Sequence, residues 1–145
     1  MAQIRHIAIR TRDVEETATF YKQAFGLKQV GTGRNGIYLT DGHLNIAILN
    51  LRPAVEGESM KLGIDHLGFQ VEDFDAAVAR IRALGGKILN DRNEVAVGNR
   101  AESSKGAADL RVPGAQPQSY FEVKCVGPDD QVIDVSSAGW VSATG

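Results

Sequence analysis

The sequence has a single cysteine, Cys125, among its 145 residues. An intrachain disulfide is therefore impossible, and a chain without disulfides fits a reducing compartment, so we expect a cytoplasmic protein. Cys125 lies in the strand-like run YFEVKC, where a cysteine commonly packs as a small buried hydrophobic residue. No neighbouring residue in the sequence would lower the pKa of the thiol, which argues against a nucleophilic cysteine.

Excess charge of one sign and long apolar stretches are also missing. The chain has 16 lysines and arginines against 18 aspartates and glutamates, which gives a net charge of −2. Nucleic-acid-binding proteins usually carry a basic patch, and a membrane-spanning helix needs about 18 consecutive apolar residues. The sequence shows neither pattern, and its first residues enter a strand pattern without a signal-peptide core. We therefore expect one domain over residues 1–145, with no nucleic acid and no membrane as partner.

What the sequence does contain is one pattern that occurs twice. RHIAIRTRDV begins at residue 5 and DHLGFQVEDF begins at residue 65. Each has a histidine at its second position, His6 or His66, in a strand-like run. Each then reaches an aspartate seven residues later, Asp13 or Asp73, at the start of a segment with helical periodicity. The constant offset of 60 residues indicates an internal repeat.

Each copy opens a unit with the element order βαβββ. The first unit spans 2–51, and a tight turn at Thr40-Asp41-Gly42 separates its last two strands. Residues 52–62 have the proline, glycine and polar residues of a linker. The second unit spans 63–140 and ends in two strands joined by the turn Pro128-Asp129-Asp130.

The second unit is less regular than the first. Between residues 90 and 118 glycine and proline recur, and only the runs EVAVG and ADLRV resemble strands. A loop of this length in a compact domain is usually functional or mobile. The tail after Trp140 is expected to be disordered.

The two helices have recognisable ends and apolar faces. Asp13 and Asp73 are suited to cap them, and Gly26 and Gly85 follow them as helix-ending residues. Their expected buried faces are formed by two sets of residues at helical spacing: Val14, Ala18, Tyr21 and Phe25 in the first helix, and Phe74, Val78, Ile81 and Leu84 in the second.

Paired βαβββ units with a histidine on each first strand resemble the vicinal-oxygen-chelate superfamily of glyoxalases, bleomycin resistance proteins and extradiol dioxygenases. The resemblance is carried by RHIAIRTRDVEETATFYKQAFGLK, DHLGFQVEDFDAAVARIRALGGK and GPDDQVIDVSS, in that order. It implies an α+β fold in which two βαβββ modules form one curved mixed sheet. It also implies a divalent metal ion held by residues of the first and last strands of the modules.

Carried over position by position, the resemblance implies His6, His66 and Asp134 as metal ligands. Asp134 stands where the family commonly has a glutamate, so the ligand strand would have to approach more closely. The corresponding position in the first module is Ala47, which cannot coordinate a metal, and Asn45 could replace it only through a shift. Two histidines and one carboxylate suit Fe, Mn, Ni, Co or Zn, and leave positions open for substrate.

Further candidates surround this set. Arg10 and Gln70 are expected to bind substrate, although a structural ion pair is an equal alternative for Arg10. Glu122 and Asp134 are the candidates for moving a proton. His43 beside the turn is expected to be exposed, and Tyr38 and Tyr120 are expected to pack in the interior.

Three functions follow from the resemblance. A lyase or isomerase similar to glyoxalase I is favoured, with a small-molecule substrate that could be a glutathione or other thiol adduct. The alternatives are an Fe(II)-dependent extradiol dioxygenase and a non-catalytic resistance protein that binds a small molecule. Loss of a carboxylate at Ala47 weighs against the first, and retention of three ligand candidates weighs against the last. Small members of this family often pair, so we expect a homodimer.

Overall fold

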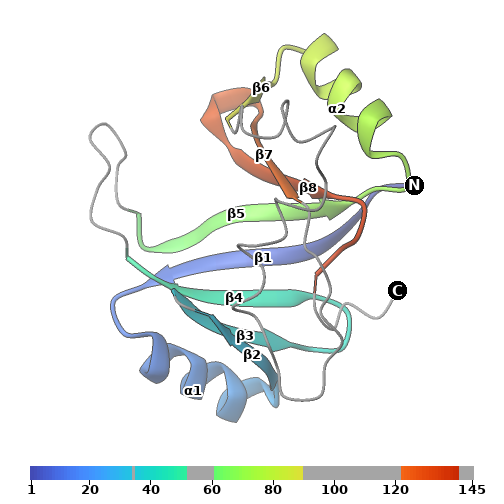
Figure 1. Ribbon diagram of the computed structural model, residues 1–145. Coiled ribbons are helices and arrows are strands. Elements are labelled where there is room, and N and C mark those ends of the chain that lie inside the picture. The colour runs from blue at the N-terminus through green and yellow to red at the C-terminus, as the bar shows by residue number, and fades with distance from the viewer. Residues whose placement is uncertain (34, 52–60, 90–121, 141–145) are drawn as a thin grey trace.

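The computed structural model describes residues 1–33, 35–51, 61–89 and 122–140. Most of the expected linker, the stretch 90–118, Tyr120 and the tail after Trp140 lie outside these residues. The elements are β1 (Gln3–Thr11), α1 (Val14–Phe25), β2 (Lys28–Gly33), β3 (Gly36–Thr40), β4 (Asn45–Asn50), β5 (Gly63–Gln70), α2 (Phe74–Ala83), β6 (Lys87–Ile88), β7 (Glu122–Val126), a 3-10 turn (Pro128–Asp130) and β8 (Val132–Ser136) (Figure 1). The predicted α+β fold with two βαβββ units is confirmed.

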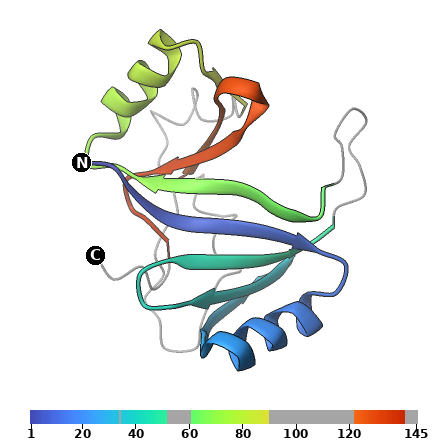
Figure 2. The ribbon, with the colours of Figure 1, turned by 180° about the vertical axis from the view of Figure 1, so that it is seen from behind.

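The eight strands that the described residues form belong to one mixed sheet with the order β2-β3-β4-β1-β5-β8-β7-β6. Each unit pairs its first strand with its own last strand in parallel, β1 with β4 and β5 with β8. The two first strands run antiparallel to one another in the middle of the sheet, where both views show them side by side (Figure 2). The repeat therefore places its two histidine-bearing strands next to each other.

The helices lie at opposite ends of the sheet and cover one of its faces (Figure 1). Buried Ala18 of α1 packs among side chains of β3 and β4, and buried Ala77 of α2 packs among side chains of β7 and β8. Because side chains alternate between the faces of a strand, His6 and Asp134 point to the other face. Among the described residues, no helix is long and apolar enough to cross a membrane.

The helix ends follow the sequence closely. Asp13 accepts a hydrogen bond from the backbone N–H of Glu16 at 2.9 Å, and Asp73 accepts one from Ala76 at 2.9 Å. Each cap satisfies a backbone donor that the first turn of a helix leaves without a partner. Gly26 ends α1 in the left-handed conformation, with φ of 71°. These predictions are confirmed.

The prediction of burial is wrong for two residues of the expected apolar faces. Phe25 is 65% exposed and Leu84 is 87% exposed, because Phe25 is the last residue of α1 and Leu84 is the residue that follows α2. Phe25 instead packs edge-on against Phe20 at 6.1 Å between ring centroids. Cys125, by contrast, is fully buried in the cluster beneath α2, as expected.

Candidate metal centre

His6 and His66 face one another across the two central strands. In the register of β1 and β5, His6 lies opposite Gly68, and His66 lies opposite Ala8, so both imidazoles point to the face without helices. The Nε2 atoms of the two rings are 3.3 Å apart, and both side chains are buried. The absence of a side chain at Gly68 leaves the room that the His6 ring needs, since a Cβ there would lie 2.7 Å from His6 Cβ.

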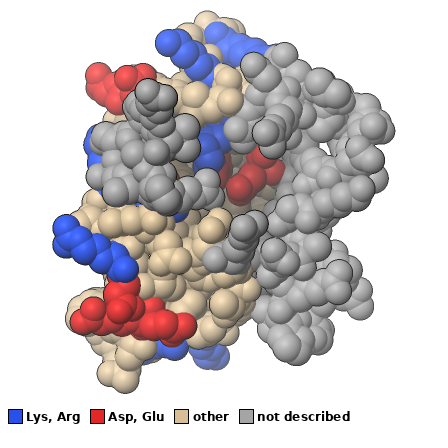
Figure 3. Space-filling model, turned by 60° about the vertical axis from the view of Figure 1, so that its left-hand side comes forward, with Lys and Arg blue, Asp and Glu red and all other residues tan. Residues whose placement is uncertain are grey.

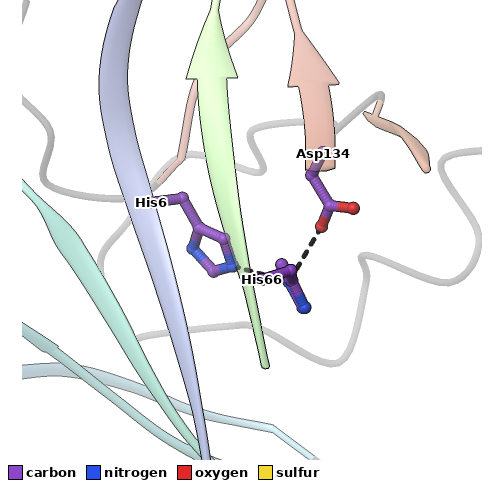
Figure 4. Close-up of side chains that lie close together, drawn as sticks. All are labelled: His6, His66 and Asp134. Carbon is purple, nitrogen blue, oxygen red and sulfur yellow. Dashed lines mark hydrogen bonds and ion pairs between the residues drawn. The ribbon is translucent and has the colours of Figure 1, made fainter. Parts of the chain in front are cut away.

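Asp134 joins the two histidines from β8, the strand next to β5. Its Oδ2 lies 2.9 Å from His66 Nε2, and the carboxylate is almost completely buried. Figure 4 shows the three side chains converging from three neighbouring strands. One ligand atom from each residue lies within 4.8 Å of the other two. The structure thus brings together the three residues that the sequence suggested as ligands.

Hydrogen bonds on the far side of each ring fix how the histidines present their nitrogens. His6 Nδ1 donates to the side-chain oxygen of Asn45 at 2.8 Å, and His66 Nδ1 donates to Asp65 Oδ2 at 2.6 Å. In the neutral rings this leaves a lone pair on each Nε2, directed toward the shared space. Two lone pairs 3.3 Å apart repel one another unless a proton or a cation lies between them.

The three atoms fit a divalent metal ion. Asp134 Oδ2 is buried, and an anionic oxygen in such a setting needs a positively charged partner, either a protonated His66 or a metal cation. A cation beside it and the two Nε2 lone pairs would satisfy all three atoms at once. Ligands bound to one metal at about 2.0–2.2 Å lie roughly 3 Å apart when adjacent, close to two of the separations found here.

The pKa values of the two histidines move in opposite directions. Burial, and then the charge of His66, lowers the pKa of His6 from 6.5 to about 4, so this ring is neutral at pH 7. Burial also acts to lower the pKa of His66, but hydrogen bonds with Asp134 and Asp65 outweigh it and raise that pKa. Burial acts to raise the pKa of Asp134, whereas His66 and Lys124 lower it overall. A metal would therefore compete with a proton mainly at His66.

Asp65 reaches His66 through an irregularity in the sheet. Ala8 pairs with His66 and Ile9 pairs with Ile64, which leaves Asp65 without a partner on β1, as in a β-bulge. Without the bulge, a residue next to His66 would point to the opposite face. The sequence shows Asp65 beside His66, but only the pairing register reveals the contact.

Ala47 and Asp134 occupy equivalent places in the two units. Ala8 pairs with Ala47, and its repeat equivalent Gly68 pairs with Asp134. Asn45 lies two residues earlier on the same strand, opposite His6, and its side-chain oxygen accepts from His6 Nδ1 rather than facing the Nε2 side of the ring. The structure thus gives Asn45 an orienting role that sequence reasoning missed.

Of the two residues expected to bind substrate, Arg10 contacts the site only indirectly. Its Nε lies 3.4 Å from Asp65 Oδ1, and its Nη1 donates to the backbone oxygen of Asn50 at 2.9 Å. Arg10, Asp65 and His66 therefore form a continuous chain. Gln70 lies at the end of β5, and its amide group packs close to Gly139.

Trp140 contacts the His6 ring, and Glu122 contacts Trp140. Trp140 stacks on the His6 ring with 4.9 Å between centroids and 11° between planes, and its Nε1 donates to Glu122 Oε2 at 2.9 Å. Residue 122 is exposed as a whole, yet the atoms crowded around its carboxyl group, and then the charge of Asp134, raise its pKa. The sequence suggested Glu122, but no pattern in the sequence indicated Trp140, which lies in the segment after the last strand.

The remaining candidates lie away from the three ligand atoms. His43 is exposed in the turn before β4, as expected. Tyr38 packs against Ala8, Ala47 and Leu49, also as expected. On the face seen in Figure 3, basic and acidic side chains are interspersed with uncharged surface.

Comparison with known proteins identifies the family. A sequence profile of the glyoxalase/bleomycin resistance protein/dioxygenase superfamily matches residues 3–106, which include both first strands and both helices. The chain belongs to this superfamily. The resemblance noted from the repeat is confirmed at this level.

Solved structures of the same superfamily share the fold at low sequence identity. A methylmalonyl-CoA epimerase in complex with methylmalonyl-CoA and NH4+ is 20% identical over 94% of both chains, with a TM-score of 0.58. The 2,3-dioxygenase LapB from Pseudomonas sp. KL28 is 20% identical, with a TM-score of 0.63 over 99% of this chain and 43% of its own. The Mn(II)-bound glyoxalase from Novosphingobium aromaticivorans is 18% identical, with a TM-score of 0.62 over 94% of this chain and 39% of its own.

Proposed function

We propose that the protein is a metal-dependent enzyme of the lyase or isomerase class, similar to glyoxalase I, whose substrate binds the metal through two neighbouring oxygens. The observation that carries the proposal is the convergence of His6 Nε2, His66 Nε2 and Asp134 Oδ2, three atoms that can each offer a lone pair to a metal once His66 has lost its proton. Neighbours that are an epimerase, a glyoxalase and a dioxygenase support a metalloenzyme without choosing among these reactions.

Each residue of the site has a distinct part in this proposal. The ion would supply Lewis-acid stabilisation of negative charge that develops on a substrate oxygen. Asn45 and Asp65 hold the imidazoles in the tautomer that can coordinate. The missing side-chain ligand at Ala47 would leave at least one more coordination position for substrate than a four-ligand site has.

Glu122 is the proposed proton-transferring residue. Burial, and then the charge of Asp134, raises its pKa above the ordinary value of a glutamate, which favours a carboxyl group that can hold a proton. Trp140 holds one of its oxygens, and the same indole stacks on His6, so the carboxyl group is tied to the candidate ligand set. Asp134 is the other candidate, but its contacts with His66 and Lys124 favour its ionised form.

An extradiol dioxygenase is the second candidate function. Two histidines and one carboxylate are the ligand set of many non-haem Fe(II) oxygenases, and Ala47 adds no further ligand. Such a reaction needs two substrates at the metal, so the open positions favour it as much as they favour chelation of a single substrate.

Metal analysis followed by activity assays tests the proposal. The protein is stripped with a chelator, dialysed separately against Mn(II), Fe(II), Co(II), Ni(II) and Zn(II), and analysed for metal content. We expect close to one ion per chain in wild type and a large loss in His66→Ala, with His43→Ala as the matched exposed-histidine control. Less than about 0.1 ion per chain in every wild-type sample would refute a metal-dependent reaction.

The loaded protein is then assayed with the hemithioacetal of methylglyoxal and glutathione and, separately, with a panel of catechols under oxygen. Turnover of the hemithioacetal, with an activity about 100-fold or more lower in Glu122→Gln, supports a lyase or isomerase reaction. Ring cleavage of a catechol only with Fe(II) supports the dioxygenase instead. A thiol-adduct substrate, a homodimer and a cytoplasmic location remain predictions.

A further inference from the structure

Lys124 is a positive charge built into the candidate metal centre. It lies on β7 directly opposite Asp134 on β8, and residues opposite one another in a sheet point to the same face. Its Nζ is 2.5 Å from Asp134 Oδ1, whereas Asp134 Oδ2 faces His66. One carboxylate is thus shared between an ammonium group and the place where a metal would bind.

The charges around the site leave an excess positive charge once a divalent ion is added. The charges of Asp134 and Lys124 cancel, and those of Asp65 and Arg10 cancel as well. Glu122 is the remaining acidic residue in contact with this part of the described structure, and it carries at most one negative charge. A divalent ion would therefore give a net positive centre, in a partly buried setting where charge is poorly screened.

Lys124 can also reach a bound ligand. Its side chain is 31% exposed, while that of Asp134 is 1% exposed, so the ammonium group lies between the buried carboxylate and solvent. An ammonium group has three N–H donors, and the contact with Asp134 uses one of them. The flexible four-carbon stem allows the others to turn toward an oxygen next to the metal.

We propose that Lys124 makes this site selective for anionic substrates of the 2-hydroxy or 2-oxo carboxylate class, which offer a carboxylate beside a second oxygen. The inference rests on the metal site of the proposed function and adds the substrate's charge to it. The ammonium group would bind the carboxylate while the two neighbouring oxygens face the metal. A neutral substrate of the same shape would leave the positive charge without a partner.

The experiment measures two affinities in the same protein. Mn(II) binding is measured by calorimetry, and displacement of Mn(II)-bound water by added ligand is followed through water-proton relaxation. Lactate and lactamide are the probes, because they have nearly the same shape and differ in charge. The variants are Lys124→Gln, Lys124→Met and Lys124→Arg, with the exposed Lys28→Gln on edge strand β2 as the control.

The two affinities should change in opposite directions. Removing the charge in Lys124→Gln should tighten Mn(II) binding about tenfold, since a like charge beside the metal is lost. Lactate should bind about tenfold more weakly and lactamide within about twofold of wild type. Lys124→Arg should keep the preference for lactate, and Lys28→Gln should change nothing. Lys124→Met, which keeps the apolar stem, serves if the glutamine variant does not fold.

A merely structural lysine would give another pattern. If Lys124→Gln weakened Mn(II), lactate and lactamide alike, or if lactate kept its full affinity, the selectivity inference would be overturned. It would also be overturned if wild type bound Mn(II) but showed no binding of lactate. If wild type bound none of the metals, the proposed function itself would fall, and this result is distinct because it appears before any ligand is added.

Discussion

Replacing Asp65 with asparagine tests whether the carboxylate behind His66 controls metal binding. Asp65 Oδ2 is 2.6 Å from His66 Nδ1, and the Asp65 side chain is 30% exposed. The hydrogen bond with His66 is the largest reason why the pKa of Asp65 falls from 3.8 to about 2. That pKa shift corresponds to about 2.5 kcal/mol. Solvent screens part of this energy and Arg10 contributes another part, so the contact between Asp65 and His66 accounts for about 1–2 kcal/mol.

The asparagine has the same shape and can still accept a hydrogen bond, but it lacks the charge that makes the imidazole a stronger ligand. Since about 1.4 kcal/mol is a tenfold change, we expect the Kd for Mn(II) to rise about 5- to 30-fold in Asp65→Asn. Calorimetric titration at one fixed pH near neutrality measures this. Asp75→Asn, an exposed aspartate in the first turn of α2, is the matched control and should leave the Kd unchanged.

The same substitution in a His66→Ala background separates a specific effect from a general one. Without the imidazole, Asp65→Asn should have no further effect on the residual Mn(II) affinity, because the two changes act through one contact. An equal loss in both backgrounds would refute the orienting role of Asp65. A Kd within twofold of wild type in the single variant would refute it as well.

Three further predictions concern pH and packing. Mn(II) binding near pH 7 should release protons, mainly from His66 with its raised pKa and none from His6, and calorimetry in buffers of different ionisation enthalpy measures the number. In the metal-free protein, the unfolded state binds more protons at His6 than the folded state between pH 6.5 and 4, so this group should lower the free energy of unfolding by up to about 3 kcal/mol as pH falls through that window. Urea titrations at a series of pH values measure this dependence, and His6→Gln should remove the part that His6 contributes. An unchanged pH dependence in His6→Gln would contradict the prediction. Gly68→Ala should lower the free energy of unfolding, measured by urea titration, by about 1–3 kcal/mol, because its Cβ would lie 2.7 Å from atoms of both His6 and Trp140. An unchanged free energy of unfolding would show that the two side chains move aside easily.

The fold followed from the sequence because its signals are local and occur twice. A strand period, a capping aspartate and a helical period recur at an offset of 60 residues, each copy is followed by a glycine that ends its helix, and each signal depends on neighbours within a few positions. The burial of Phe25 and Leu84 was predicted wrongly for a related reason. Periodicity places a residue on a face of the helix but does not say where the sheet beneath that face ends.

The candidate ligands also came from the sequence, but their partners did not. Asp65 meets His66 because a bulge in β5 turns a side chain that alternation would place on the opposite face. Lys124 meets Asp134 because of the register of β7 and β8, which local sequence leaves open. Trp140 reaches His6 from the segment after the last strand, and no periodic pattern predicts such a contact.

By itself, the sequence determined the order of elements, the helix ends and two histidines at equivalent positions of a repeat, because these depend on nearest neighbours and on comparison of one half with the other. The tertiary structure decided how the three candidate ligand atoms converge, which ring nitrogen each histidine directs toward them and which positive charge lies beside Asp134. Those properties depend on distances of a few ångströms between strands far apart in the chain. Coulomb energies and hydrogen bonds change steeply over such distances, so strand register rather than composition sets the chemistry of the site.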